Sequence, residues 1–347
     1  MSEEHENFLT QPEEAARLDD ARPFSHKEMV TCEECLRANP PTRPKCLYCG
    51  IKLPLPDATV SSGRRPVIRQ PEKWEEGYNV VLLERASAPD KLLSEVAGLL
   101  RLERAEAARI LEASRPLPLA RVDSVEEARL VEERLRASGL SVLVVSDSDL
   151  MMREESRNRA RAFDFEEDGL VAYAAGGNGI WRAEWSDLIL LATGRLVTRR
   201  VELEERRNRQ GSEVVDAREM TGDVMLLDLY TERSDGGWRV ASDSFDFSCL
   251  GSGKALVAAQ NFSALVEALS RRAPRMIVDD SYNSLRQALA PVWPPEERTE
   301  SRGLRRERPG RFNTEAVMTS DNETQFTRYS RLRQLLRLRE GARSKPE

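Results

Sequence analysis

The chain has 347 residues, of which 40% are hydrophobic and 32% are charged, and its formal net charge is −6 at pH 7. This length predicts two or three domains, and the negative charge argues against a protein that coats nucleic acid over its whole surface. No run of about 18 apolar residues is present, so a membrane-spanning helix is not expected.

Histidine is scarce, because His5 and His26 are the only two in the chain. Both lie in residues 1–28, which are acidic and are expected to form a disordered tail. Histidine is the commonest general acid–base at neutral pH, so an enzyme that uses one in its folded body is disfavoured. This N-terminal segment lacks the apolar core of a secretory signal, and we expect a cytoplasmic location.

Four of the five cysteines form two Cys-x-x-Cys pairs separated by ten residues: Cys32, Cys35, Cys46 and Cys49. Each pair can present both sulfurs to one ion, and four thiolates that close a tetrahedron favour zinc. A site with four protein ligands keeps no position open for water, so residues 29–53 are predicted to form a zinc ribbon around one structural ion. A pair of disulfides and an iron centre of the rubredoxin type are the alternatives.

The segment TCEECLRANPPTRPKCLYCG resembles the bacterial zinc-ribbon module, and Asn39, Pro40 and Gly50 match that pattern besides the cysteines. The cysteine spacing is also similar to that of the Ran-binding-protein type of finger, which implies binding of single-stranded RNA or ubiquitin. That family places a Trp just before the first cysteine, where this chain has Val30-Thr31.

Residues 54–77 contain four prolines and are expected to form an extended linker. Residues 78–150 then alternate short apolar runs with segments of helical spacing, which predicts a β-α-α-β-α-β order. Ser124 is a good N-cap for the third helix, with Glu127 completing a capping box, and Gly139 is placed to end that helix.

Residues 78–147 resemble the C-terminal domain of the bacterial ribosomal stalk protein, and the ClpS protease adaptor is similar in fold. The resemblance is carried by the opening strand, by Glu106-Ala107 at a helix start, by the Pro116 to Pro118 region, and by the helix from Glu126 to Gly139. It implies a fold that binds other proteins, such as translation factors in the stalk protein and destabilising N-terminal residues in ClpS.

Residues 155–295 are predicted to form a β-rich, barrel-like domain. Seven or eight short strands are expected between residues 163 and 250, the last at 245–250 with Cys249 as a buried apolar residue. Helices at 262–272 and 281–290 would close the barrel. The strand that carries Trp181 and Trp185, with the closing helix, gives residues 160–290 a distant resemblance to PH-like domains, which implies a ligand or peptide groove.

Residues 296–347 are rich in arginine and have little apolar content before Phe326, so they are expected to form a solvated tail with one short helix near 326–340. Such a helix could contact RNA or the ribosome through phosphates.

These patterns together predict a multidomain α+β protein. The function that they favour is that of a non-catalytic cytosolic zinc-binding adaptor that acts through other proteins. The alternatives are a ribosome- or RNA-associated factor that uses the zinc ribbon and the arginine-rich tail, and an enzyme with an unrecognised site in the β-rich domain.

Overall fold

The computed structural model describes residues 29–40, 45–51, 53, 71, 75–87, 89–113, 115–151, 158–177, 179–208, 211–232, 237–308 and 311–343. They belong to two compact units, residues 1–67 and residues 68–347. The expected acidic tail and most of the expected linker lie outside the described residues. The described part has a mixed α+β fold.

In the first unit, strand β1 (Val30–Thr31) pairs antiparallel with β2 (Ala38–Asn39). Among the described residues of this unit, the buried core beside the hairpin consists of Cys32, Cys46 and Leu53. Such a core is too small to fold a chain without help, so the unit depends on its cysteine cluster.

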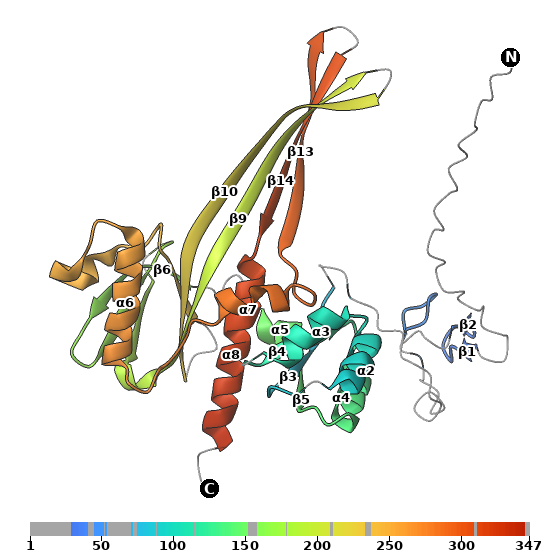
Figure 1. Cartoon of the computed structure of the whole chain (residues 1–347), viewed down its shortest axis with the longest axis horizontal. Coiled ribbons are helices and arrows are strands. Elements are labelled where there is room, and N and C mark those ends of the chain that lie inside the picture. Colours follow the sequence, from blue (N-terminus) through green and yellow to red (C-terminus); the bar gives the residue numbers. More distant parts are fainter. Residues whose placement is uncertain are drawn as a thin grey trace, which may run out of the picture. The chain divides into compact units, whose positions relative to one another are not determined.

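The second unit begins with elements in the predicted β-α-α-β-α-β order (Figure 1). They are β3 (Tyr78–Leu82), α2 (Asp90–Leu100), α3 (Arg104–Leu111), β4 (Leu117–Val122), α4 (Val125–Ala137) and β5 (Val142–Ser146), with the single turn α5 (Asp147–Leu150) after them. Strand β3 lies between β4 and β5 and is antiparallel to both. As predicted, the Ser124 side chain accepts a hydrogen bond from the Glu127 N–H at the start of α4, and Gly139 follows the helix with a φ of +85°.

A nine-stranded sheet forms most of the remaining described residues, in the order β13-β14-β9-β10-β11-β6-β7-β8, with β12 paired to β9. Its strands are β6 (Asn158–Phe165), β7 (Gly169–Ala174), β8 (Ile180–Glu184), β9 (Leu188–Asn208), β10 (Gly211–Thr231), β11 (Gly237–Ala241), β12 (Ile277–Asp279), β13 (Glu296–Arg308) and β14 (Arg311–Asp321). Helix α6 (Ala258–Arg272) contributes Phe262, Leu265 and Leu269 to a buried core that also contains Phe163 of β6 and Trp238 of β11.

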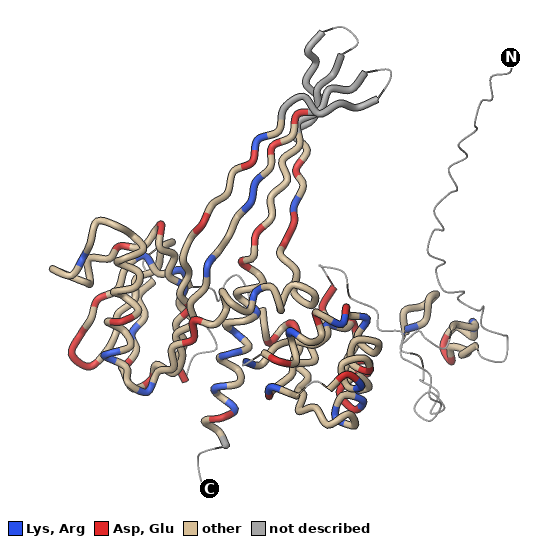
Figure 2. The backbone as a smooth tube through the Cα atoms, viewed as in Figure 1, with Lys and Arg blue, Asp and Glu red and all other residues tan. Residues whose placement is uncertain are grey.

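Strands β9 and β10 have 21 residues each and pair over their whole length, where the sequence predicts short strands. With β13 and β14 they form two adjacent hairpins that extend beyond the other strands of the sheet (Figure 1). Both acidic and basic residues lie along the described residues of these hairpins (Figure 2). Arg195 pairs with Asp223 at 2.6 Å and Arg199 with Glu219 at 2.7 Å across β9 and β10. A strand is recognised in a sequence by alternating apolar and polar residues. Charged side chains interrupt this pattern along β9 and β10, so the sequence does not predict their full length.

The predicted strand at 245–250 is wrong, because a 3₁₀ helix, η3 (Phe247–Gly253), occupies this segment. Asp246 initiates the turn, since its side chain accepts a hydrogen bond from the Ser248 N–H at 3.0 Å. Asx side chains before such a turn compete with the strand conformation. Cys249 therefore lies in the 3₁₀ helix, half-buried, and not on a strand face.

The C-terminal residues differ most from their prediction. Where a solvated tail is expected, β13 and β14 join the sheet and the 21-residue helix α8 (Glu323–Arg343) is packed inside the unit. Phe326, Tyr329 and Leu332 of α8 are fully buried. They share one core with the α/β elements and with α7 (Tyr282–Leu289), so buried residues of 78–150 pack in the same cluster as the C-terminal helices.

Candidate metal centre

The predicted zinc ligands are brought together in the first unit. The ligand atoms of Cys32, Cys35, Cys46 and Cys49 all lie within 4.8 Å of one another. The sulfurs of Cys32 and Cys49 are 3.5 Å apart and those of Cys35 and Cys46 are 3.4 Å apart, and all four residues are free thiols and not disulfides. A tetrahedron with Zn–S bonds of about 2.3 Å has sulfurs about 3.8 Å apart, so these spacings fit one four-coordinate ion.

The two cysteine pairs have the same backbone geometry. The Cys32 N–H donates to the Arg37 carbonyl at 3.0 Å, and the Cys46 N–H donates to the Ile51 carbonyl at 2.8 Å. In each pair the residue after the second cysteine turns back with a positive φ, which is 56° at Leu36 and 74° at Gly50. This repeated turn directs both sulfurs of each pair to one point, as a shared ion requires.

Asn39 is fully buried and ties the two pairs together. Its Nδ2 donates to the Cys46 sulfur at 3.5 Å, and its Oδ1 accepts from the Leu47 N–H at 2.8 Å. Desolvation raises the pKa of the Cys46 thiol, but N–H donors from Tyr48, Cys49 and Asn39 outweigh it and lower that pKa to about 6. Hydrogen bonds of this kind stabilise a thiolate ligand and fix its direction.

The donor set decides which ions fit. Four thiolates suit zinc, or iron in the same tetrahedral geometry, and do not suit the hard ions magnesium and calcium. Because the four protein ligands complete the coordination, this centre has the form of a structural site and not of a catalytic one.

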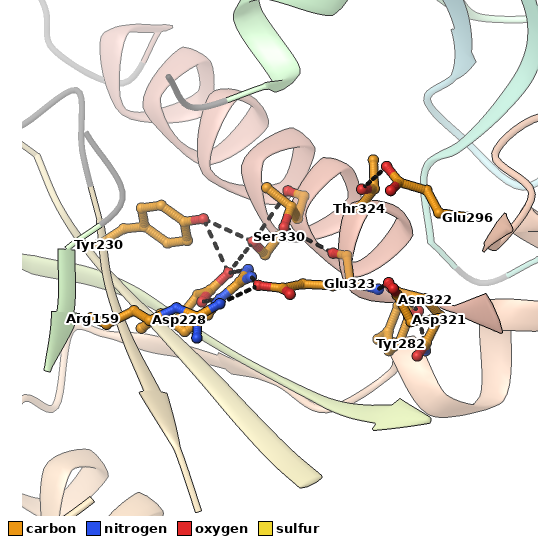
Figure 3. Close-up of polar contacts among 12 residues, drawn as sticks. Arg159, Asp228, Tyr230, Tyr282, Glu296, Asp321, Asn322, Glu323, Thr324 and Ser330 are labelled. Carbon is orange, nitrogen blue, oxygen red and sulfur yellow. Dashed lines mark hydrogen bonds and ion pairs between the residues drawn. The ribbon is translucent and has the colours of Figure 1, made fainter. Parts of the chain in front are cut away.

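The second unit contains buried carboxylates among its described residues. Asp228 of β10 lies opposite Arg239 of β11 in the register, and both side chains are about 5% exposed or less. Arg239 binds Asp228 through two parallel hydrogen bonds of 2.7 Å, and Ser330 of α8 donates to the same carboxylate at 2.5 Å. Figure 3 labels Asp228 and Ser330 of this group together with Tyr230, whose hydroxyl lies 2.8 Å from that of Ser330.

Two further buried carboxylates are held in the same way. Asp279 accepts from the Ser281 N–H, the Tyr329 hydroxyl and Arg333, and Asp147 accepts from the Gly77 N–H, Asn79 and Arg121. A charged residue inside an apolar run, as in MLLDLY and GWRVA, is the sequence signal by which Asp228 and Arg239 could have been found.

A scan against protein-family models and searches of curated proteins and of solved structures found no match to this chain. Every described helix is either too short or too polar to cross a lipid bilayer.

Proposed function

We propose that this protein is a non-catalytic, zinc-binding adaptor whose zinc unit binds another protein. The proposal rests mainly on Leu36, which is 76% exposed although it occupies a left-handed backbone position. Such positions favour glycine, which the second cysteine pair has at Gly50. A large apolar side chain that is both strained and exposed contributes little to folding, which supports a role in binding.

Other apolar side chains of the same unit are also exposed. Leu47, Tyr48 and Ile51 are about half exposed, and the Arg37 guanidinium lies over the Tyr48 ring at 4.6 Å. Aromatic and arginine side chains are enriched in protein interfaces. We name Leu36, Leu47, Tyr48 and Ile51 the knuckle residues.

The buried carboxylates favour a non-catalytic role for the second unit. Asp147, Asp228 and Asp279 are each held by an arginine and by further N–H or O–H donors. Carboxylates that are fully engaged in this way stabilise a fold, whereas a general base needs a free lone pair within reach of its substrate.

Two arginines in the middle of α8 are engaged within the chain, which weakens the case for RNA binding through them. Arg333 pairs with Asp279 at 2.6 Å, and Arg331 donates to the Asp149 carbonyl at 3.1 Å.

The substitution Leu36→Gly tests the proposal because it removes the side chain and relieves the backbone at once. We expect in-cell crosslinking followed by mass spectrometry to find partners with the wild-type chain and with Leu256→Gly, a fully exposed residue of the other unit. The same partners should be lost with Leu36→Gly and with Tyr48→Ala, while bound zinc remains at one ion per chain. Partners that persist in both knuckle variants would contradict the proposal.

A further inference from the structure

The second unit contains a partly open cavity of about 130 Å³. Its walls come from the end of α2, from β4, from residues 291–296 and from α8. Apolar residues that line it are Pro71, Leu100, Leu102, Leu119, Ala120, Pro291, Val292, Pro294 and Pro295, and polar atoms line it to a similar extent. An enclosed, wholly apolar cavity of about 150 Å³ holds a benzene molecule, so the volume here is close to that needed by a small apolar body.

Arg328 of α8 lines this cavity, and its side chain is 13% exposed. Its Nε is buried and has no hydrogen-bond partner among the described residues. Its ion pair with Asp147 spans 3.7 Å from Nη2 to Oδ2, which is too long for a hydrogen bond. Burial lowers the pKa of Arg328. The nearby carboxylates therefore do not fully offset the loss of hydration of its guanidinium. A buried guanidinium nitrogen without a hydrogen bond is costly unless a ligand completes it.

The other charged groups around Arg328 already have partners. Asp147 accepts from the Gly77 N–H at 2.9 Å and from Arg121 at 2.8 Å, so it has little capacity left for Arg328. Arg121 also donates to the carbonyls of Pro71 and Glu75. The Glu296 carboxylate accepts from Arg298 at 2.7 Å and from the Thr324 hydroxyl, a contact that Figure 3 includes.

We propose that this cavity binds a small monocarboxylate whose apolar body is no larger than a phenyl ring. The carboxylate accepts hydrogen bonds from Arg328, whose guanidinium presents donors in a fork that matches two carboxylate oxygens. The apolar body contacts Leu100, Leu119 and Val292. This site is independent of the zinc unit and adds a ligand to the proposed adaptor.

Benzoate is a suitable probe, with benzamide as its neutral counterpart and acetate as a carboxylate without the apolar body. Calorimetric titration of the full wild-type chain should find one saturable benzoate site, with at least tenfold weaker binding of benzamide and acetate. Methyl resonances of Leu100, Leu119 and Val292 should shift on addition of benzoate. Equal binding of benzoate and benzamide, or shifts confined to other methyl groups, would overturn the proposal.

Variants give a second and separate test. Arg328→Met should weaken benzoate binding at least tenfold, whereas Arg199→Met, in an ion pair whose arginine side chain is 61% exposed, should leave it unchanged. Because Arg328 makes no hydrogen bond among the described residues, its replacement should not lower the melting temperature. Unchanged benzoate affinity in a folded Arg328→Met chain would refute the proposal. If that variant failed to fold, the comparison of benzoate with benzamide in the wild-type chain would still test whether the site recognises a carboxylate.

Discussion

The sulfur cluster supplies most of what holds the first unit together, because the described core there contains one aliphatic side chain, Leu53, besides two of the cysteines. Metal binding and folding are therefore one equilibrium in this unit. At a four-thiolate metal site each sulfur supplies a bond that water or a hydroxyl group replaces poorly.

We predict that Cys35→Ser abolishes the zinc centre. Elemental analysis should find one zinc ion per chain in the wild-type protein and none in the variant, and proteolysis should then cleave within residues 29–53. Cys249→Ser is the matched control, since Cys249 lies in η3 of the other unit and should keep full zinc content. Equal zinc content in both variants would show that Cys35 is not a ligand. Iron found in place of zinc would support the rubredoxin-type alternative.

Asp279 gives the second unit a dependence on pH. Burial opposes its ionisation, but the Ser281 N–H, Arg333 and the Tyr329 hydroxyl outweigh this and hold its pKa below the ordinary value of 3.8. The unfolded chain then binds more protons than the folded chain near this pH, so stability rises with pH. The contribution is complete above the unfolded pKa and is lost as the pH falls through the lowered folded pKa.

We therefore expect the free energy of unfolding to fall as the pH is lowered from about 5 to about 3, and to fall less steeply in Asp279→Asn. Urea unfolding at a series of pH values measures both slopes. Parallel slopes for the two proteins would assign the acid sensitivity to other carboxylates. At neutral pH the variant should be the less stable one, because Arg333 loses its charged partner.

At the scale of elements, α8 explains why burial is hard to recognise in this sequence. The spacing of Phe326, Tyr329 and Leu332 predicts a helix. The eight arginine and glutamate residues of the same segment, however, suggest that this helix is exposed to solvent. In the structure α8 contacts the sheet through Ser330 and the α/β elements through Arg331, so both sides of the helix are covered. A helix that is covered on two sides has no single apolar stripe.

Other features of the fold also differ in whether the sequence predicts them, according to whether they depend on neighbouring or on distant residues. The cysteine cluster and the α4 cap at Ser124 depend on neighbouring residues, so local patterns predict them. The length of β9 and the pairing of Asp228 with Arg239 depend on partners that are distant in the chain or on cross-strand register. Register of this kind is fixed by the assembled sheet and not by the strand alone.

Leu332 distinguishes a packed α8 from a solvated tail. Because Leu332 is fully buried, Leu332→Ala should lower the free energy of unfolding by about 2–5 kcal/mol. Arg339→Ala, at an exposed position of the same helix, should change it by less than about 0.5 kcal/mol. Chemical denaturation followed by circular dichroism measures both values. Equal and small effects would show that α8 is dispensable to the fold.

At the scale of the whole second unit, Trp293 joins parts of the chain that are far apart in sequence. It is fully buried, and its indole N–H donates to Asn79 of β3 at 2.8 Å. Its own carbonyl accepts from Gln325 of α8 at 2.6 Å. Asn79 in turn donates to Asp147, so one chain of hydrogen bonds runs from α8 through Trp293 to the α/β elements.

This connection predicts that the second unit unfolds as one body. Trp293→Ala should cost about 3–5 kcal/mol, since it removes a large buried side chain and leaves Asn79 without its donor. In hydrogen exchange followed by mass spectrometry, peptides from residues 78–146 and from 188–231 should lose protection together. Peptides from the zinc unit should exchange as in the wild-type chain and supply the internal control. Loss of protection in residues 78–146 alone would mean that the α/β elements are an autonomous domain after all, and that the shared core contributes little to their stability.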